Sequence, residues 1–415
     1  WTGPARQSFL CGSLASLDKN LAALGSRLII RRGSAEAELD KLIRETGADA
    51  VFTNRDPDPF GKSMEQKIGS LCDRLRVEFH SFKDAVLHEP GEILSRAGAP
   101  YRVFTPYGKN WLSLPKTGPL PRVNSLGPAP KIASLPLPTL DTWRLKPDAT
   151  SVPEPGEKAA RQRLKLFVGS GILAHYGRDR NLPAGHTTSR LSQDLRWGLI
   201  SIRELHSRCA TSPDRASAQA YLKELAWREF YMSVLHHWPE VLEHEFNADF
   251  RRVAWPGDDD AFGAWKQGRT GFPIVDAGMR ELLATGLMHN RVRMITAMFL
   301  TKDLHVHWRL GESFFMQHLV DGEIASNNGG WQWSAGTGAD AAPYFRIQNP
   351  WTQTKTYDPN GEYIKKWLPE LTDVPPVKFM SPPERPLHPD YPMPIVDHAR
   401  ERECTLKRFR HARPK

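Results

Sequence analysis

The sequence predicts a two-part protein, in which an α/β domain with a parallel sheet that is incomplete at its start precedes an all-α domain. Over residues 1–112, short strand-like segments alternate with helical ones, a pattern typical of βαβ units. From residue 157 to residue 415 the segments become long, helical and rich in Trp, Arg and His. The segment between them, 113–156, is dense in proline and predicts an extended linker.

Each element of the first domain is predicted from its periodicity and its terminating residue. Helices are expected where apolar residues recur at helical spacing up to a glycine or the next strand, at 13–25, 35–47 and 63–75. Strands are expected where β-branched and apolar residues form short runs, at 26–33, 48–56 and 77–82. The strand that normally opens such a domain is not found before residue 13, so we expect the sheet to be incomplete.

Composition narrows the class of protein. The 415-residue chain is 40% hydrophobic, carries a net charge of +9 and has a pI of about 9.3, which favours an anionic partner, nucleic acid first; a merely basic surface is the alternative. No run approaches the roughly 18 apolar residues of a membrane span. The four cysteines are scattered without a CxxC pair, so we expect a reducing, cytoplasmic setting and no metal site.

Three segments carry candidate chemistry. "GHTTSRLSQDLRWGLIS" (185–201) places hydroxyl side chains at a helix start, which serve either as a phosphate seat or as ordinary caps. In "ELAWREFYMSVL" (224–235), an acid, an indole, a guanidinium and a phenol share one helical face, which is typical of a ligand-lined wall, although a core face with snorkelling charges gives the same spacing. "HNRVRMITAMFLTKDL" (289–304) precedes Asp321 and Glu323, two carboxylates that could join Arg293 in a buried ion network.

The stretch "SNNGGWQWSAG" (326–336) combines amides, paired glycines and two tryptophans. Residues two apart on a helix project about 200° apart, so Trp331 and Trp333 are expected to face different surroundings. Gly329 and Gly330 permit close backbone packing. By itself, a Trp-x-Trp pair is also compatible with core packing.

Taken together, several ordered motifs resemble the photolyase/cryptochrome flavoproteins, most closely the class I cyclobutane pyrimidine dimer (CPD) DNA photolyases. The motifs are "TSRLS", "WREF", "FPIVDAGMREL", "HNRVRM", "DGEIASNNGGWQWSAGTGADAAPYFRI" and "YIKKWLPEL". The resemblance implies an α/β antenna domain, a helical domain that binds FAD, and light-driven repair of a flipped-out dimer by electron transfer from reduced FAD. It also implies pyrimidine-dimer DNA as partner, a monomer, and a second antenna chromophore of the folate or deazaflavin type, whose identity the sequence leaves open.

The resemblance also implies roles for individual positions. FAD contacts are implied at Tyr176, Thr188, Ser189, Arg190, Leu191, Ser192, Arg228, Arg293, Asp321, Glu323 and Asn327. The dimer cavity is implied at Glu224, Trp227, Asn290, Met294 and Trp333. Electron transfer from the surface to FAD is implied along Trp255, Trp308 and Trp331, and DNA-strand contacts at Arg180, Arg291 and Gln353.

Some positions depart from the family pattern. Glu323 stands where aspartate is frequent, and Gln348 replaces a usual aromatic residue. "NRDPDPFGKSMEQ" does not match the acidic contact of folate-binding antennas. A cryptochrome-type photoreceptor without repair activity is the main alternative; Asn327 and the set Trp227, Met294 and Trp333 argue against it.

Overall fold

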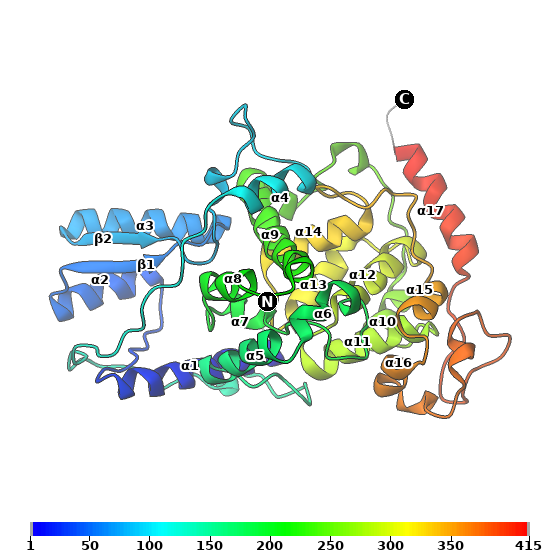
Figure 1. Ribbon diagram of the computed structural model, residues 1–415, viewed down its shortest axis with the longest axis horizontal. Coiled ribbons are helices and arrows are strands. Elements are labelled where there is room, and N and C mark those ends of the chain that lie inside the picture. The colour runs from blue at the N-terminus through cyan, green and yellow to red at the C-terminus, as the bar shows by residue number, and fades with distance from the viewer. Residues whose placement is uncertain (1–2, 413–415) are drawn as a thin grey trace.

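The computed structural model describes residues 3–412 and has two parts of unequal size. Figure 1 shows a small α/β unit at one end of the long axis and a larger helical part that fills the rest. Residues 413–415, the end of the predicted helical domain, lie outside the described residues. None of the described helices is both long and apolar enough to cross a membrane.

The α/β unit contains a two-stranded parallel sheet. Strands β1 (Ala50–Asn54) and β2 (Glu78–Phe82) pair in the register that sets Ala50 opposite Glu78. Helix α3 (Pro59–Leu75) makes the crossover that parallel strands require. Helix α2 (Ala35–Thr46) begins at the Ser34 cap and ends at Gly47 in the left-handed conformation, as the sequence predicts.

The predicted strand at 26–33 is wrong. The segment is extended, but it belongs to no sheet and none of its residues is buried. The backbone N–H groups of Leu28 and Ile30 donate to the side chains of Asp18 and Ser134, and Leu135 N–H donates to the Ile30 carbonyl. Because its backbone groups bond side chains and the linker, no ladder forms with β1.

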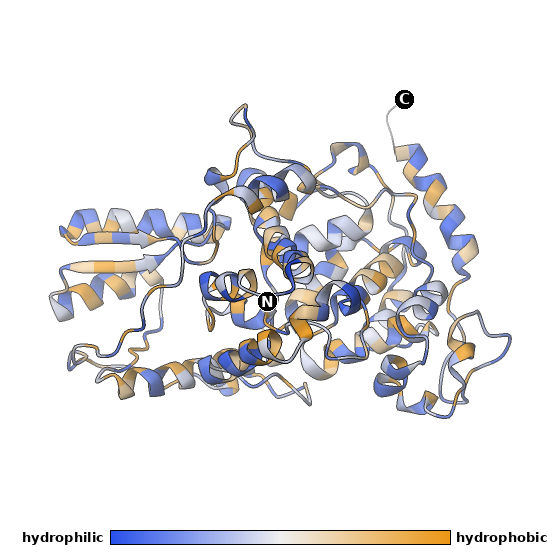
Figure 2. Cartoon of the chain, viewed as in Figure 1, coloured by the Kyte–Doolittle hydropathy of each residue, from blue (hydrophilic) through white to orange (hydrophobic). Residues whose placement is uncertain are grey.

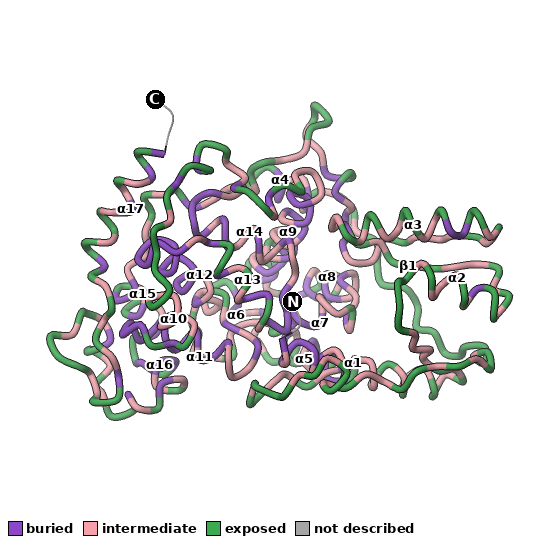
Figure 3. The backbone as a smooth tube through the Cα atoms, turned by 180° about the vertical axis from the view of Figure 1, so that it is seen from behind, coloured by how far each residue is buried: buried purple, intermediate pink, exposed green. Residues whose placement is uncertain are grey.

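The packing also departs from the predicted domain boundary at residue 112. Helix α4 (Phe104–Ser113) packs against α9 (Arg215–His237), and its Tyr107 and Trp111 are buried in the same hydrophobic core as that helix. Helix α1 (Pro4–Ala23) packs against α5 (Glu157–Gly169) and α13 (Trp308–His318) rather than against the sheet. Buried segments are accordingly concentrated in the helical part, as Figure 3 shows.

Within the predicted linker 113–156, Ser113 is the last residue of α4, and residues 114–156 contain no helix or strand apart from one 3-10 turn, Leu140–Trp143. The helical part beyond it is built from helices around two hydrophobic cores. Besides α5, α9 and α13, these helices are α6 (Ile172–Asp179), α7 (Ser192–Arg196), α8 (Ile202–Ala210), α10 (Asp259–Gln267), α11 (Pro273–Thr285), α12 (Asn290–Met298), α14 (Ile324–Ala335), α15 (Pro350–Tyr357), α16 (Glu362–Trp367) and α17 (His398–Ala412).

Helix α14 is central to the helical part because it contacts α9, α12 and α13. The chain between α12 and α13 contains a π-helical turn at Phe299–Asp303, against which α17 packs. Figure 2 shows α17 as a largely hydrophilic helix at the periphery; Phe409 on its inner face is buried against Phe250. The fold class predicted for both parts is therefore confirmed, with a smaller sheet than expected.

Candidate active site

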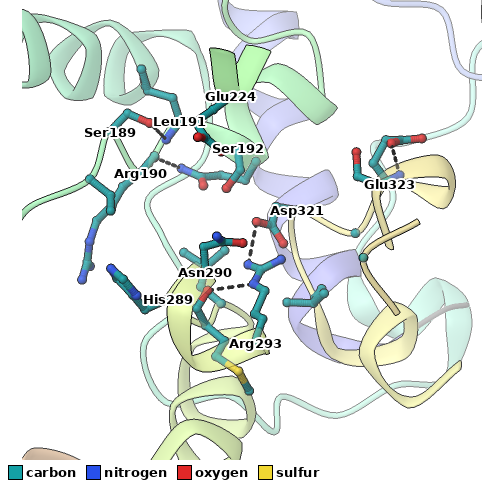
Figure 4. Close-up of a pocket in the computed structure, with 18 of the residues that line it drawn as sticks. Ser189, Arg190, Leu191, Ser192, Glu224, His289, Asn290, Arg293, Asp321 and Glu323 are labelled. Carbon is teal, nitrogen blue, oxygen red and sulfur yellow. Dashed lines mark hydrogen bonds and ion pairs between the residues drawn. The ribbon is translucent and has the colours of Figure 1, made fainter. Parts of the chain in front are cut away.

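A cavity of about 1050 Å³ opens among α6, α7, α9, α12 and α14. Figure 4 shows side chains from these elements converging on it, with Ser189 and Glu224 on one side and Arg293 and Asp321 on the other. More basic than acidic side chains line the cavity. It is as large as a cofactor site and its electrostatics suit an anionic ligand.

One wall is the polar and aromatic face of α9. Glu224, Trp227, Arg228 and Tyr231 all line the cavity, so the prediction from their spacing that they share one helical face is confirmed. Trp227 also stacks on Phe104 of α4, with ring centroids 3.7 Å apart and planes 9° apart. The second aromatic ring holds Trp227 in a fixed orientation, with part of its surface left to the cavity.

Glu224 and Arg180 form an ion pair at the cavity wall. Burial raises the pKa of the Glu224 carboxyl, and the neighbouring Arg180 guanidinium opposes that rise. Burial in turn lowers the pKa of Arg180, but Glu224 and Tyr176 outweigh it and the net shift is upward. The sequence placed these two residues in different roles, one toward the dimer and one toward DNA, and the structure brings them into contact.

A second ion pair joins α12 to the turn before α14. Arg293 Nη2 lies 2.8 Å from Asp321 Oδ2, and Arg293 Nε donates to the Met288 carbonyl at 2.8 Å. The predicted pairing of Arg293 with Asp321 is therefore confirmed. The second carboxylate oxygen, Asp321 Oδ1, is buried without a hydrogen-bond partner among the described residues. A buried acceptor of this kind requires a donor from a ligand or water.

Helix α14 begins at an unusual cap. Both carboxylate oxygens of Glu323 accept backbone N–H groups, Oε1 from Ala325 at 2.9 Å and Oε2 from Ser326 at 2.7 Å. Glu323 lines the cavity and also stabilises the helix that carries Asn327.

The amides and glycines of α14 have separate tasks. Asn327 Nδ2 donates to the Glu312 carbonyl at 3.0 Å, and in this orientation Oδ1 is the amide atom that remains to face a ligand. A Cβ at Gly329 would lie 2.0 Å from Cδ1 of Tyr231, so this glycine allows α14 to pack directly on α9. A Cβ at Gly330 would meet nothing within 4 Å, and Gly330 lines the cavity.

The two tryptophans of α14 do face different surroundings. Trp331 is 2% exposed and makes edge contacts with Phe315 and Trp265, at centroid distances of 5.0 and 6.1 Å. Trp333 is half-buried. Both tryptophans line the cavity, and their side chains reach it from different positions along α14.

The hydroxyl-rich segment before α7 forms another side of the cavity. Tyr221 donates a hydrogen bond to Ser189 Oγ at 3.1 Å, and Arg190 adopts a left-handed backbone conformation with φ of 50°. A non-glycine residue in that region stores strain and is often found at ligand sites. The helix that follows has five residues, so it adds few free N–H groups to the hydroxyls.

Most of the predicted site residues meet at this cavity. It is lined by Tyr176, Arg180, Thr188, Ser189, Arg190, Leu191, Ser192, Glu224, Trp227, Arg228, Asn290, Arg291, Arg293, Met294, Asp321, Glu323, Asn327, Trp331 and Trp333. Three predicted residues, Trp255, Trp308 and Gln353, are not part of its lining. Arg228 also donates to the Ala85 carbonyl at 2.7 Å, so it additionally anchors the chain after β2.

Comparison with known proteins agrees with this geometry. Residues 221–411 match the family model described as the FAD binding domain of DNA photolyase, and residues 1–125 match the model described as DNA photolyase. The chain belongs to the DNA photolyase family. It is 41% identical to the deoxyribodipyrimidine photo-lyase of Halobacterium salinarum over 99% of this chain and 89% of that protein.

Two solved structures extend the comparison. A class III photolyase from Agrobacterium tumefaciens superposes with a TM-score of 0.92 at 38% identity, covering 99% of this chain and 89% of that one. A cryptochrome from Synechocystis superposes with a TM-score of 0.89 at 28% identity, covering 98% and 88%. Family membership therefore rests on sequence and fold over nearly the whole chain.

The residues present fit FAD, the cofactor of this family. The cavity provides hydroxyl and cationic groups near Ser189 for phosphates, an open glycine position at Gly330 for a flat ring, and the unpartnered acceptor Asp321 Oδ1 for a ring donor. The bulk of Trp331 on the same helix as Gly330 closes the cavity against the core.

Several residues of the site were not found from the sequence. Phe104 comes from a segment more than a hundred residues before Trp227, and no local pattern pairs them. Glu281 lines the cavity and accepts hydrogen bonds from Tyr363 Oη and from His289 N–H. His289, whose pKa burial lowers to about 4, caps α12 by accepting Arg291 N–H. The "HNR" motif was the one available signal for this residue.

Proposed function

We propose that this photolyase repairs cyclobutane pyrimidine dimers in DNA with light, using FAD held in the cavity. The observation that carries the proposal is that one cavity brings together the residues implied for the dimer and those implied for the flavin. The Halobacterium relative at 41% identity is named deoxyribodipyrimidine photo-lyase, which supports the same reaction here. FAD bound there in its reduced state would supply the light-driven one-electron chemistry that splits the dimer, with no net change of redox state.

The chain's own residues hold the cofactor and exclude water. Tyr176 and the run Thr188–Ser192 would contact the phosphates and ribityl chain, while Asn327 and the Arg293–Asp321 pair would contact the ring edge. Asn327 offers an uncharged acceptor there, so it adds no negative charge beside a reduced, anionic ring.

A second group of residues receives the damaged base pair. Trp227 and Trp333 offer aromatic surfaces for stacking, each worth about 1–3 kcal/mol per base. Glu224 and Asn290 supply hydrogen-bonding groups for base edges, and Met294 supplies an adaptable apolar contact. Arg180 and Arg291 would neutralise strand phosphates, and the net charge of +9 favours approach to DNA. A dimer is already poorly stacked and paired, which lowers the cost of flipping it out.

A cryptochrome-type photoreceptor is the second candidate, because a cryptochrome shares the fold with a TM-score of 0.89. Identity favours the repair enzyme, at 41% with the photo-lyase relative against 28% with the cryptochrome. Action as a cytoplasmic monomer, the DNA contact of Gln353 and an antenna chromophore of the folate or deazaflavin type remain predictions.

The test is a repair assay on the purified FAD-loaded protein. The protein is reduced, mixed with an oligonucleotide that contains one CPD, and exposed to blue light, while absorbance at about 260 nm follows the return of separate pyrimidine rings. Repair in light but not in darkness is expected. Binding of FAD without any repair in light would favour the photoreceptor instead.

A further inference from the structure

The indole of Trp308 has an unusual partner for a core tryptophan. Trp308 is completely buried, and its Nε1–H donates to Oε1 of Glu245 at 3.0 Å. Glu245 is itself only 6% exposed. Within residues 3–412, this indole is the one hydrogen-bond donor to the Glu245 carboxylate. A buried carboxylate is costly when so few donors compensate its lost hydration.

Other indoles of the helical part are satisfied by neutral acceptors. Trp265 Nε1–H donates to the Thr296 carbonyl at 3.1 Å, and Trp197 Nε1–H donates to the Val320 carbonyl at 2.9 Å. Packing a tryptophan in this core therefore does not require a charged partner.

Trp111 differs from these two tryptophans because its indole donates to a carboxylate, that of Glu229, at 2.6 Å. That carboxylate also accepts the backbone N–H groups of Leu87 and His88, so it joins three segments of the chain. Glu245 joins no such set: besides the Trp308 indole, its carboxylate faces the His307 imidazole, whose Nε2 lies 3.8 Å from Oε1.

Trp308 lies between the other two tryptophans of the implied electron path. On the outer side, the His307 ring is 5.5 Å from Trp255 and 5.7 Å from Trp308 between centroids. On the inner side, Gly311, one turn after Trp308 on α13, lies so close to Trp331 that a Cβ would be 2.2 Å from Cη2. The Glu245 carboxylate is thus hydrogen-bonded to the middle member of the series.

We infer that Glu245 is a positioning residue for electron transfer: its carboxylate stabilises the positive charge left on Trp308 when that indole gives up an electron. The inference rests on the proposed function, FAD held in the cavity, and on the electron path that the resemblance implies, in which Trp331 would give an electron to oxidised FAD excited by light. One electron then passes from Trp308 to the oxidised Trp331, and one passes from Trp255 to Trp308. An external thiol finally reduces Trp255: it gives up one electron and releases its proton to solvent, and two thiyl radicals then couple to a disulfide, so electrons and protons balance.

The direction of charge movement follows from electrostatics. A full negative charge at the indole N–H favours the positively charged ring more than a carbonyl dipole does, and burial reduces the screening of that attraction. Positive charge is therefore drawn outward from Trp331 to Trp308, away from the flavin, before it can return.

The experiment compares Glu245→Gln with Glu243→Gln in the FAD-loaded protein. Glutamine keeps an oxygen acceptor for the indole but removes the charge, and Glu243 is an exposed acid two residues away. Transient absorption after a blue flash reports oxidised indole, and steady illumination with a thiol gives the yield of FAD photoreduction. We expect the yield of Glu245→Gln to fall about tenfold, the change that about 1.4 kcal/mol on a barrier produces, and the yield of Glu243→Gln to equal the wild type's.

Two further measurements separate this role from a structural one. The ¹H–¹⁵N signal of the Trp308 indole should persist in Glu245→Gln, and repair by the chemically reduced variant should equal the wild type's, because that electron comes from FAD. Glu245→Asp, which restores the charge, should recover most of the photoreduction yield, and it serves as the test variant if Glu245→Gln does not fold. The inference would be overturned if Glu245→Gln and Glu243→Gln gave equal photoreduction yields. It would also be overturned if the yield of Glu245→Asp were as low as that of Glu245→Gln. Loss of repair in every protein, including the wild type, would instead refute the proposed function.

Discussion

At the scale of single residues, the site depends on aromatic side chains whose partners differ. Trp227 stacks on Phe104, also contacts Phe230 and Tyr231, and lines the cavity. Trp331 is held by Phe315 and Trp265 and meets the cavity with little exposure. In the proposed function, the same residue type would stack a base in one place and pass an electron in the other.

Replacing Trp227 with alanine should weaken binding to CPD-containing DNA by about 1–3 kcal/mol, the usual loss of one stacking partner. Binding to undamaged DNA should change little, because phosphate contacts dominate there. Titration of both DNAs by fluorescence anisotropy measures the two affinities. Equal losses on the two DNAs would move Trp227 from the dimer site to the general DNA surface or to the core.

Replacing Trp331 with phenylalanine should abolish light-driven reduction of oxidised FAD, because phenylalanine is far harder to oxidise than an indole. Repair by chemically reduced protein should survive. Trp265→Phe is the matched control, since Trp265 is equally buried and touches Trp331 but is not a member of the implied path. Rapid photoreduction in Trp331→Phe, followed by absorbance, would refute the assignment.

At the scale of elements, α14 combines weak helix formers with close packing. Its two adjacent glycines cost helix stability, and each has a spatial reason in the structure. Gly329 is needed where α14 crosses Tyr231 of α9, whereas Gly330 opens onto the cavity.

These two positions give a matched pair of variants. Gly329→Ala should lower the free energy of unfolding by about 1–3 kcal/mol, because its methyl group would overlap the Tyr231 ring. Gly330→Ala should raise the free energy of unfolding of the FAD-free protein by about 0.5–1 kcal/mol through helix propensity. The same methyl group occupies cavity space, so FAD affinity should fall.

Denaturant unfolding and FAD titration measure both effects. A Gly330→Ala protein that binds FAD as tightly as the wild type would show that the cofactor does not approach this position. A Gly329→Ala protein of unchanged stability would show that α9 and α14 can separate without cost.

At the scale of the whole molecule, Glu229 ties the N-terminal segments to the helical part. Its carboxylate accepts Trp111 Nε1–H at 2.6 Å, Leu87 N–H at 2.5 Å and His88 N–H at 3.1 Å. Complete burial raises the pKa of Glu229 to about 6, although these hydrogen bonds oppose the rise.

This raised pKa predicts a pH dependence of stability. The contribution of a carboxyl whose pKa is higher in the folded protein is fully present below its ordinary value of 4.5 and is lost as pH rises through about 6. Relative to Glu229→Gln, which cannot titrate, the wild type should lose about 2 kcal/mol of unfolding free energy between pH 4 and pH 7. Urea unfolding of both proteins across this range checks the slope. A difference that stays constant with pH would contradict the assignment.

The sequence by itself determined the two-part organisation and the shared face of α9, because helical periodicity is a local property. It also led through the ordered motifs to nineteen residues that the structure gathers at one cavity, and to the pairing of Arg293 with Asp321. The segment 26–33 shows the limit of local patterns. It has the composition of a strand, yet a strand forms only where a neighbour offers a ladder, and its N–H groups found side chains instead.

Tertiary structure alone decided which distant residues complete the site. Three contacts join segments that lie between 44 and 123 positions apart in the sequence. They are the stacking of Phe104 on Trp227, the ion pair of Arg180 with Glu224, and the hydrogen bond of Trp308 to the Glu245 carboxylate. No periodicity links such residues, because their contact arises from the packing of whole helices against one another. The charge beside a buried indole, on which the inferred control of electron transfer depends, is therefore a property of the folded chain.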